Sequence, residues 1–154
     1  MNRLLMVAFV LVAPLARDGE AQIRHGRDRC AVCDMLIGDQ GFAGVARYAG
    51  GEEQQFDDLA CLFKAILDAS GGVTDAWIED RLDGHLFPLQ EAYVVQGSRV
   101  RTPMGSGIVA FANGKSAQRY ARSVGARVVR LAEVNPSDLV RALSDALKEQ
   151  ITIR

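Results

Sequence analysis

The sequence predicts a mixed α+β fold in which a strand-strand-helix-strand plan occurs twice. Three observations support this. Two short strand pairs each precede an amphipathic helix, glycines follow both helices, and a strand rich in apolar residues comes after each glycine. Phe56 and Phe111 also occupy matching places just before the two helices. We therefore expect α+β architecture with two tandem ββαβ units and a further helix at the C-terminus.

The first unit is predicted from its strand pattern and one clear helical face. Strands are expected at 41–48, 53–56 and 75–79. Between the last two, Asp57 or Asp58 is a suitable N-cap. Apolar residues then recur at helical spacing until Gly71-Gly72, and they are Leu59, Leu62, Phe63, Ile66 and Leu67.

The second unit repeats this order. Strands are predicted at 92–96, 108–112 and 126–131, and a glycine-rich loop at 101–107 separates the first two. Asn113 can cap the second helix and Gly125 can end it. A last helix is expected after Asn135, because Pro136 suits the first helical position and an apolar stripe follows.

These patterns divide the chain into five segments. We predict a signal peptide at 1–21, an irregular arm at 22–38, ββαβ units at 39–82 and 83–134, and the C-terminal helix at 135–154. The first segment has a short basic start, a brief apolar run and small residues before a cleavage site after Ala21. We therefore expect export to the periplasm, with no stable membrane span in the mature chain.

The composition excludes some classes of partner. The net charge is −1, and no basic patch with interleaved aromatic residues is present, which argues against nucleic-acid binding. We also find no Ser/His/Asp arrangement, phosphate-binding loop or dinucleotide fingerprint. The sequence therefore favours a binding protein rather than an enzyme.

The arm holds the most informative chemistry, Cys30-Ala-Val-Cys33-Asp-Met35. Thiolate and thioether sulfur are the ligands that copper(I) prefers. Cys33 and Met35 would point the same way in an extended segment. Zinc would more typically require four Cys or His ligands. We interpret this string as a copper(I) site; a Cys30–Cys33 disulfide and a redox motif are the alternatives.

Other residues could add to this site. Met104 lies in the glycine-rich loop and could supply a further sulfur, although methionine more often fills a core gap. Cys61 lies off the apolar face of the first helix. It is either an exposed thiol or one that the arm covers, and a covered thiol would be inert, would pair with an arm cysteine or would share a metal. His25 and His85 are possible ligands, but solvated side chains are the more usual outcome.

Three stretches resemble the NosL family, whose members are accessory proteins for the maturation of nitrous oxide reductase. They are Cys30-Ala-Val-Cys33-Asp-Met35, Phe56-Asp57-Asp58, and Thr102-Pro-Met104-Gly-Ser-Gly107 with Ala110-Phe111. The resemblance covers about Arg29 to Glu133. It implies a copper(I) chaperone for the copper–sulfur centre of that reductase, and a tandem ββαβ fold similar to part of organomercurial lyase.

The resemblance also implies roles for single residues. Cys33 and Met35 match the family's Cys-x-Met copper motif, Met104 matches its loop methionine, and Cys30 precedes the motif. Asp34 stands where the family often has glycine, and a carboxylate there could alter metal release. Many members are lipoproteins, whereas no lipid-site cysteine is evident here. A thiol enzyme, either a disulfide oxidoreductase or an organomercurial lyase with Asp34 as proton donor, is the alternative function.

Overall fold

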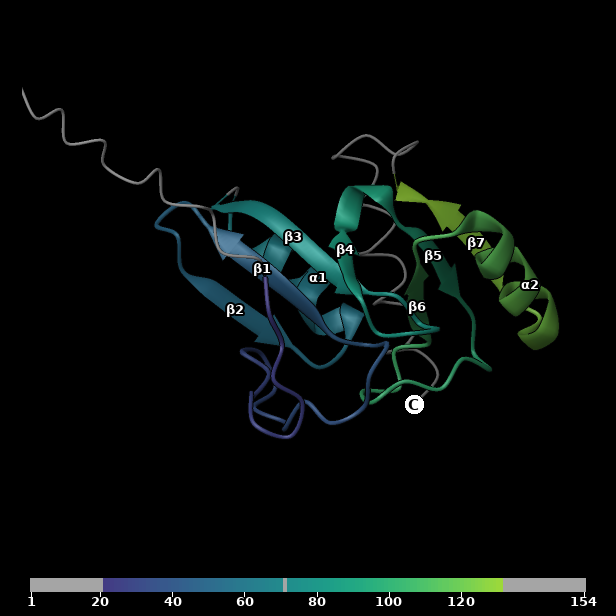
Figure 1. Cartoon of the computed structure of the whole chain (residues 1–154), viewed down its shortest axis with the longest axis horizontal. Helices are drawn as coiled ribbons and strands as arrows, with labels where there is room; N and C mark the ends of the chain where they lie inside the picture. The colour runs from purple at the N-terminus through teal and green to yellow at the C-terminus, as the bar shows by residue number, and fades with distance from the viewer. Residues whose placement is uncertain (1–20, 71, 132–154) are drawn as a thin grey trace, which may run out of the picture.

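A computed structural model describes residues 21–70 and 72–131, which form two antiparallel sheets and two α-helices (Figure 1). This confirms the predicted mixed α+β class. The expected C-terminal helix at 135–154 and residues 1–20 of the expected signal peptide lie outside the described residues. Within the described part of the chain, no helix is long and apolar enough to cross a membrane.

The first sheet has four strands in the order β2-β1-β3-β4, and α1 packs on it. Its elements are β1 (Gly44–Tyr48), β2 (Glu53–Phe56), α1 (Leu59–Asp68), β3 (Val73–Glu79) and β4 (Leu86–Pro88). Gly44 of β1 lies close to α1, because an added Cβ would lie 2.7 Å from the Leu62 side chain. A larger residue there would push α1 away from β1.

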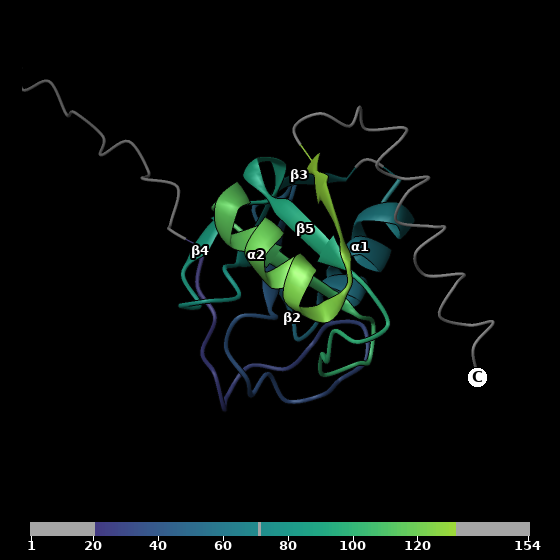
Figure 2. The same cartoon turned by 90° about the vertical axis from the view of Figure 1, so that its right-hand side faces the viewer.

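The second sheet has three strands in the order β6-β5-β7, with α2 across one face (Figure 2). Its elements are β5 (Tyr93–Gln96), β6 (Ile108–Phe111), α2 (Gly114–Val124) and β7 (Arg127–Arg130), and the 3₁₀ turn η1 (Leu89–Glu91) precedes them. The Asn113 side chain accepts hydrogen bonds from the first turn of α2. Gly125 ends the helix with a left-handed φ of 64°.

One buried apolar cluster spans both sheets, and a second lies between the second sheet and α2. Phe56, Leu62 and Ile78 from the first half belong to the same buried cluster as Val94 and Ile108 from the second. Helix α1 also contacts β6 directly. The halves therefore cannot separate without exposing apolar surface to water.

The arm, residues 22–38, contains turns and one isolated bridge but no helix, and it is a packed part of the fold. It folds back on itself through a bridge between Arg29 and Leu36, and Gly26 N donates to Ile37 O at 2.8 Å. Ala31 N then donates to Gln55 O of β2 at 2.9 Å, and Ile37 is completely buried. In Figure 1 the arm runs in purple below β1 and β2.

Strand β4 and the turn η1 are the elements that the sequence did not predict. β4 has three residues and pairs with β3, where Trp77 lies opposite Pro88. A strand this short gives no periodic signal, and a proline at its end is typical of a sheet edge. The segment after the first unit thus extends the first sheet before the chain enters the second.

Candidate metal centre

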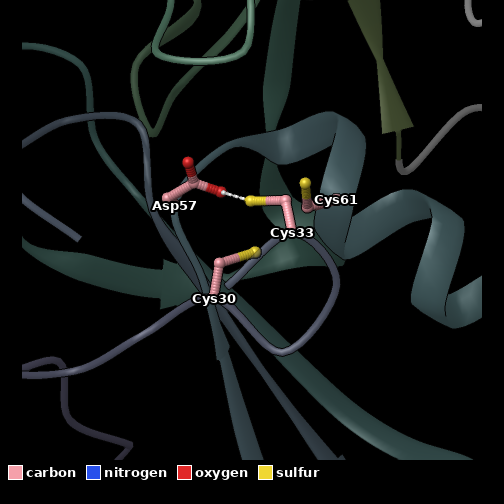
Figure 3. Close-up of side chains that lie close together, drawn as sticks. All are labelled: Cys30, Cys33, Asp57 and Cys61. Carbon is pink, nitrogen blue, oxygen red and sulfur yellow. Dashed lines mark hydrogen bonds between the residues drawn. The ribbon is translucent and has the colours of Figure 1, made fainter. Parts of the chain in front are cut away.

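Two separate elements carry the cysteines of the candidate site. Cys30 and Cys33 lie on the turn of the arm, which closes through hydrogen bonds from Cys30 N to Met35 O and from Asp34 N to Cys30 O, both 2.9 Å. Cys61 lies in the first turn of α1. Figure 3 shows the three side chains close together, with Asp57 beside them. We call Cys30, Cys33 and Cys61 the thiol cluster.

The ligand atoms of this group lie close together. The three sulfur atoms and one carboxylate oxygen of Asp57 are all within 4.8 Å of one another. Cys30 is 3% exposed, Cys61 5% and Asp57 2%, whereas Cys33 is partly exposed. All three cysteines are free thiols, so the structure contains no Cys30–Cys33 disulfide.

Asp57 and its neighbour Asp58 have different roles: Asp57 faces the thiols, whereas Asp58 caps α1. Asp58 is the N-cap of α1 and accepts a hydrogen bond from Ala60 N at 2.8 Å. Asp57 Oδ1 instead accepts from the Cys33 thiol at 3.3 Å, and its buried Oδ2 has no hydrogen-bond partner among the described residues. A buried carboxylate oxygen without a partner is unusual in a folded protein.

The electrostatics of the cluster favour a single thiolate among the three cysteines. A hydrogen bond with Cys61 lowers the pKa of the Cys30 thiol to about 4, and backbone N–H groups assist. Burial raises the pKa of Cys33 to about 11, and the hydrogen bond with Cys30 followed by burial raises the pKa of Cys61. Burial, followed by the neighbouring Cys30, also raises the pKa of Asp57.

This donor set suits a soft metal ion. Thiolate sulfur binds copper(I) strongly, and two or three thiolates at this spacing can surround one ion. The residues present therefore fit copper(I). Four donors that include a carboxylate would also be compatible with zinc.

The two predicted methionine ligands are more exposed than the thiols. Met35 is 44% exposed and Met104 39%. Met104 N donates to Asp58 Oδ2 at 3.1 Å, so the loop 101–107 is held against the start of the helix that carries Cys61. The structure thus brings Cys30 and Cys33 together, places Met35 on the same turn and attaches the Met104 backbone nearby.

Asp34, where the family often has glycine, has a local explanation. Its φ is 59°, in the left-handed region that glycine adopts most easily and aspartate tolerates. Its side chain is exposed and pairs with Arg29 at 3.3 Å. The residue therefore belongs to the turn rather than to the inward-facing ligand group, and the carboxylate beside the thiols is Asp57.

The sequence analysis interpreted Asp57 only as a possible helix cap, so it missed this residue of the site. It gave shared metal binding as one possibility for Cys61, and the structure places Cys61 beside the arm cysteines. The sequence does contain a signal for Asp57. Only one of two adjacent aspartates at a helix start can occupy the N-cap position, so the other is available for a different role. His25 and His85 form no part of the cluster; they pair with Glu79 and Asp83, respectively.

Comparison with known proteins identifies the family. The family model for NosL matches residues 22–139 of the chain. The chain belongs to the NosL family.

Two relatives support this assignment. The copper-binding lipoprotein NosL of Stutzerimonas stutzeri is 32% identical over 131 residues, which cover 78% of this chain and 68% of that protein. The crystal structure of the copper chaperone NosL from Shewanella denitrificans matches with a TM-score of 0.67 at 23% identity. That match covers 77% of this chain and 97% of the other, and it shows that the two share a fold.

Proposed function

We propose that this NosL-family protein is a periplasmic copper(I) chaperone that holds its ion with Cys30, Cys33, Met35 and Met104. The observation that carries the proposal is the convergence of buried thiols beside a turn that also bears an exposed methionine. Relatives named copper-binding and copper chaperone support it.

Thiolate and thioether sulfur suit the two tasks of a copper chaperone, which are to hold the ion and to release it to a partner. Thiolates hold copper(I) tightly, and neutral thioethers bind the same soft ion without adding charge. Because Met35 and Met104 are partly exposed, they are accessible to the ligands of a partner protein. The ion would pass by ligand exchange, with no covalent bond made or broken in the chaperone.

The recipient in this proposal is a copper enzyme of the periplasm, with the copper–sulfur centre of nitrous oxide reductase as the expected destination. Family membership supports this choice, and the predicted signal peptide at 1–21 supports export to the same compartment. A transfer assay from the copper-loaded chaperone to the apo-reductase tests it directly. Equal rates of centre assembly from free copper(I) and from the chaperone would contradict the delivery role.

The ligand set is tested by an anaerobic titration of the reduced protein with copper(I) against a chromophoric competitor. We expect one tightly bound ion, with weaker binding for Cys33→Ser, Met35→Leu and Met104→Leu. Val32→Ala is the matched control, since Val32 is exposed on the same turn and has no sulfur. A wild-type protein that never competes for copper would overturn the proposal.

One observation favours a second candidate, a thiol enzyme that cleaves carbon–mercury bonds. Asp57, with a raised pKa, lies beside three thiols and could pass its proton to the carbon while mercury stays on two thiolates. This corrects the earlier placement of the proton donor at Asp34, which is exposed and ion-paired. Stoichiometric or catalytic release of benzene from phenylmercury would support the enzyme, and loss of that release in Asp57→Asn would locate the donor.

A further inference from the structure

Two hollows, of about 510 and 660 Å³, adjoin the loop that carries Met104. Residues from 39–42 and 98–105, together with Arg81, line them, and both are lined by Arg101 and Thr102. They therefore meet at this loop, and we call them together the loop groove. Because Met104 N donates to Asp58 Oδ2 at the start of α1, the groove begins beside the candidate metal centre.

The loop groove is positively charged although the chain as a whole is not. Arg81, Arg99 and Arg101 line it, and Asp39 is the one acidic residue in its described lining. The net charge of the whole chain is −1. None of the three guanidinium groups forms an ion pair with a carboxylate of residues 21–70 or 72–131. Positive charge gathered in a hollow attracts acidic groups and orients them as they approach.

Arg81 has unused hydrogen-bond donors at this groove. Its guanidinium carbon lies 4.4 Å from the ring centroid of Phe42. Such stacking uses the face of the guanidinium and leaves the N–H donors in its plane free for other partners. The Nε atom is buried without a hydrogen-bond partner among the described residues, which is unusual in a folded protein. A carboxylate at the edge of the guanidinium would accept two parallel hydrogen bonds from it.

The other two arginines differ in how far the fold already uses them. Arg99 lies against Gly125 at the C-terminal end of α2, where a cation is favoured by the helix dipole. Arg101 is exposed in the loop itself. Arg81 and Arg101 are therefore the pair available to a partner.

We propose that the loop groove docks an acidic segment of the copper acceptor, with Arg81 and Arg101 pairing with its carboxylates. The proposal rests on the proposed copper delivery and names the chemistry of the partner's contact surface. Docking there places the acceptor beside Met104 and the thiol cluster. Hollows of this size hold ligands much larger than one carboxylate, which favours a protein segment over a free anion. Charge pairs at the edge of a contact speed association and fix orientation more than they add affinity, which suits brief delivery.

The docking surface is tested first without copper, by titrating the ¹⁵N-labelled protein with hexaglutamate peptide. The Arg81 Nε–H signal is observed by nuclear magnetic resonance, since its burial should slow exchange of this proton with water. The backbone amide of Thr102 reports on the groove in the variants. We expect a saturable shift of both signals with hexaglutamate and none with hexaglutamine.

Substitutions should locate the binding. Arg81→Gln should weaken it about tenfold, the effect of one lost charge-assisted pair. Arg101→Gln should weaken it about threefold, because exposed pairs contribute less, and at an exposed position it leaves folding unaffected. Arg81→Lys, which keeps the charge without the planar fork, should restore only part of the loss. Arg119→Gln removes the same charge from an exposed position of α2 and is the matched control.

Two outcomes of the titration overturn the proposal. Equal weakening by Arg119→Gln would mean that the peptide responds to overall charge and not to the groove. Acetate or inorganic phosphate that shifts the signals as strongly as hexaglutamate, at equal concentration of anionic groups, would mean that the groove binds free anions.

Copper transfer to apo-nitrous oxide reductase then tests the partner. We expect Arg81→Gln to slow transfer with its copper(I) affinity unchanged, and added salt to slow wild type more than the variant. If wild type delivers copper but Arg81→Gln and Arg119→Gln deliver it equally fast, the docking proposal is wrong and the delivery role stands. If wild type does not accelerate assembly of the centre, the proposed function fails, and with it the identity of the partner, even where the peptide binds.

Discussion

At the scale of single residues, the adjacent Asp57 and Asp58 divide two tasks. Asp58 is completely buried and accepts hydrogen bonds from Ala60 N and Met104 N, while Asp57 accepts from the Cys33 thiol. Asp58 thus holds the start of α1 and the loop 101–107 together, and Asp57 faces the thiol cluster.

Substitution of Asp58 should separate these contacts. Asp58→Ala is expected to lower the free energy of unfolding by about 1 kcal/mol for the lost cap and by about another 1 kcal/mol for the lost loop hydrogen bond. Asp58→Asn, which keeps a capping oxygen, should lose only the second part. Urea denaturation of both variants measures this; an Asp58→Asn variant as stable as wild type would show that the loop contact contributes nothing.

The part of the site whose residues are close together in the sequence could be predicted from the sequence. Cys30, Cys33 and Met35 lie within six residues, so their types and spacing are enough to indicate a soft-metal ligand group. Cys61 and Asp57 could not be placed, because their role depends on where the arm docks. That docking rests on backbone hydrogen bonds such as Ala31 N to Gln55 O, which side-chain patterns do not encode.

At the scale of elements, the arm decides whether the cluster exists. Its packing rests on the buried side chain of Ile37 and on the bridge between Arg29 and Leu36. Cys61 is covered only while the arm stays in place.

Ile37→Ala should therefore both destabilise the protein and open the cluster. Removing a buried isoleucine side chain costs about 2–5 kcal/mol. We expect the thiol of Cys61 to react faster with a thiol reagent in this variant than in wild type. Leu36→Ala, at an exposed position next to it, should leave the labelling rate unchanged. Unaltered labelling in Ile37→Ala would show that the arm does not control access.

The arm also carries a pH-dependent contact. The hydrogen bond from Arg24 lowers the pKa of the buried Asp28 carboxyl below its ordinary 3.8. A carboxyl whose folded-state pKa is lowered contributes stability above its unfolded pKa, and this contribution is lost as pH falls through the folded value.

We therefore expect wild type to be more stable than Asp28→Asn at neutral pH, with the difference shrinking below about pH 4. Unfolding free energies measured from pH 7 to pH 2.5 check this. A difference that stays constant over the range would mean that packing, rather than charge, accounts for the effect of the substitution.

At the scale of the whole molecule, contacts between the halves join the two sheets into one unit. Arg81 N donates to Ala110 O at 2.8 Å, Asp80 Oδ2 accepts from Ala112 N at 2.7 Å, and the buried cluster spans both sheets. The sequence indicated two similar units from their helical faces and turn glycines. It did not reveal this shared core, because apolar periodicity shows that a face is buried and not what buries it.

One consequence is a single unfolding transition. Trp77, the one tryptophan, lies on β3 of the first sheet, whereas far-ultraviolet circular dichroism reports on both sheets and both helices. We expect the two signals to change at the same urea concentration. Ile108→Ala in the second sheet should shift both midpoints equally, and separate midpoints would mean that the halves unfold independently.

The partial exposure of Cys33, beside the enclosed Cys30 and Cys61, has a kinetic consequence. A copper ion bound at this position would be open to an incoming ligand beside Cys33 and enclosed on its other sides, so its spontaneous escape into solvent would be slow. Exchange would begin when an acceptor's own sulfur contacts the ion beside Cys33. The observed rate of transfer should then rise in proportion to acceptor concentration and greatly exceed the rate of loss to a bulky chelator that cannot reach that face.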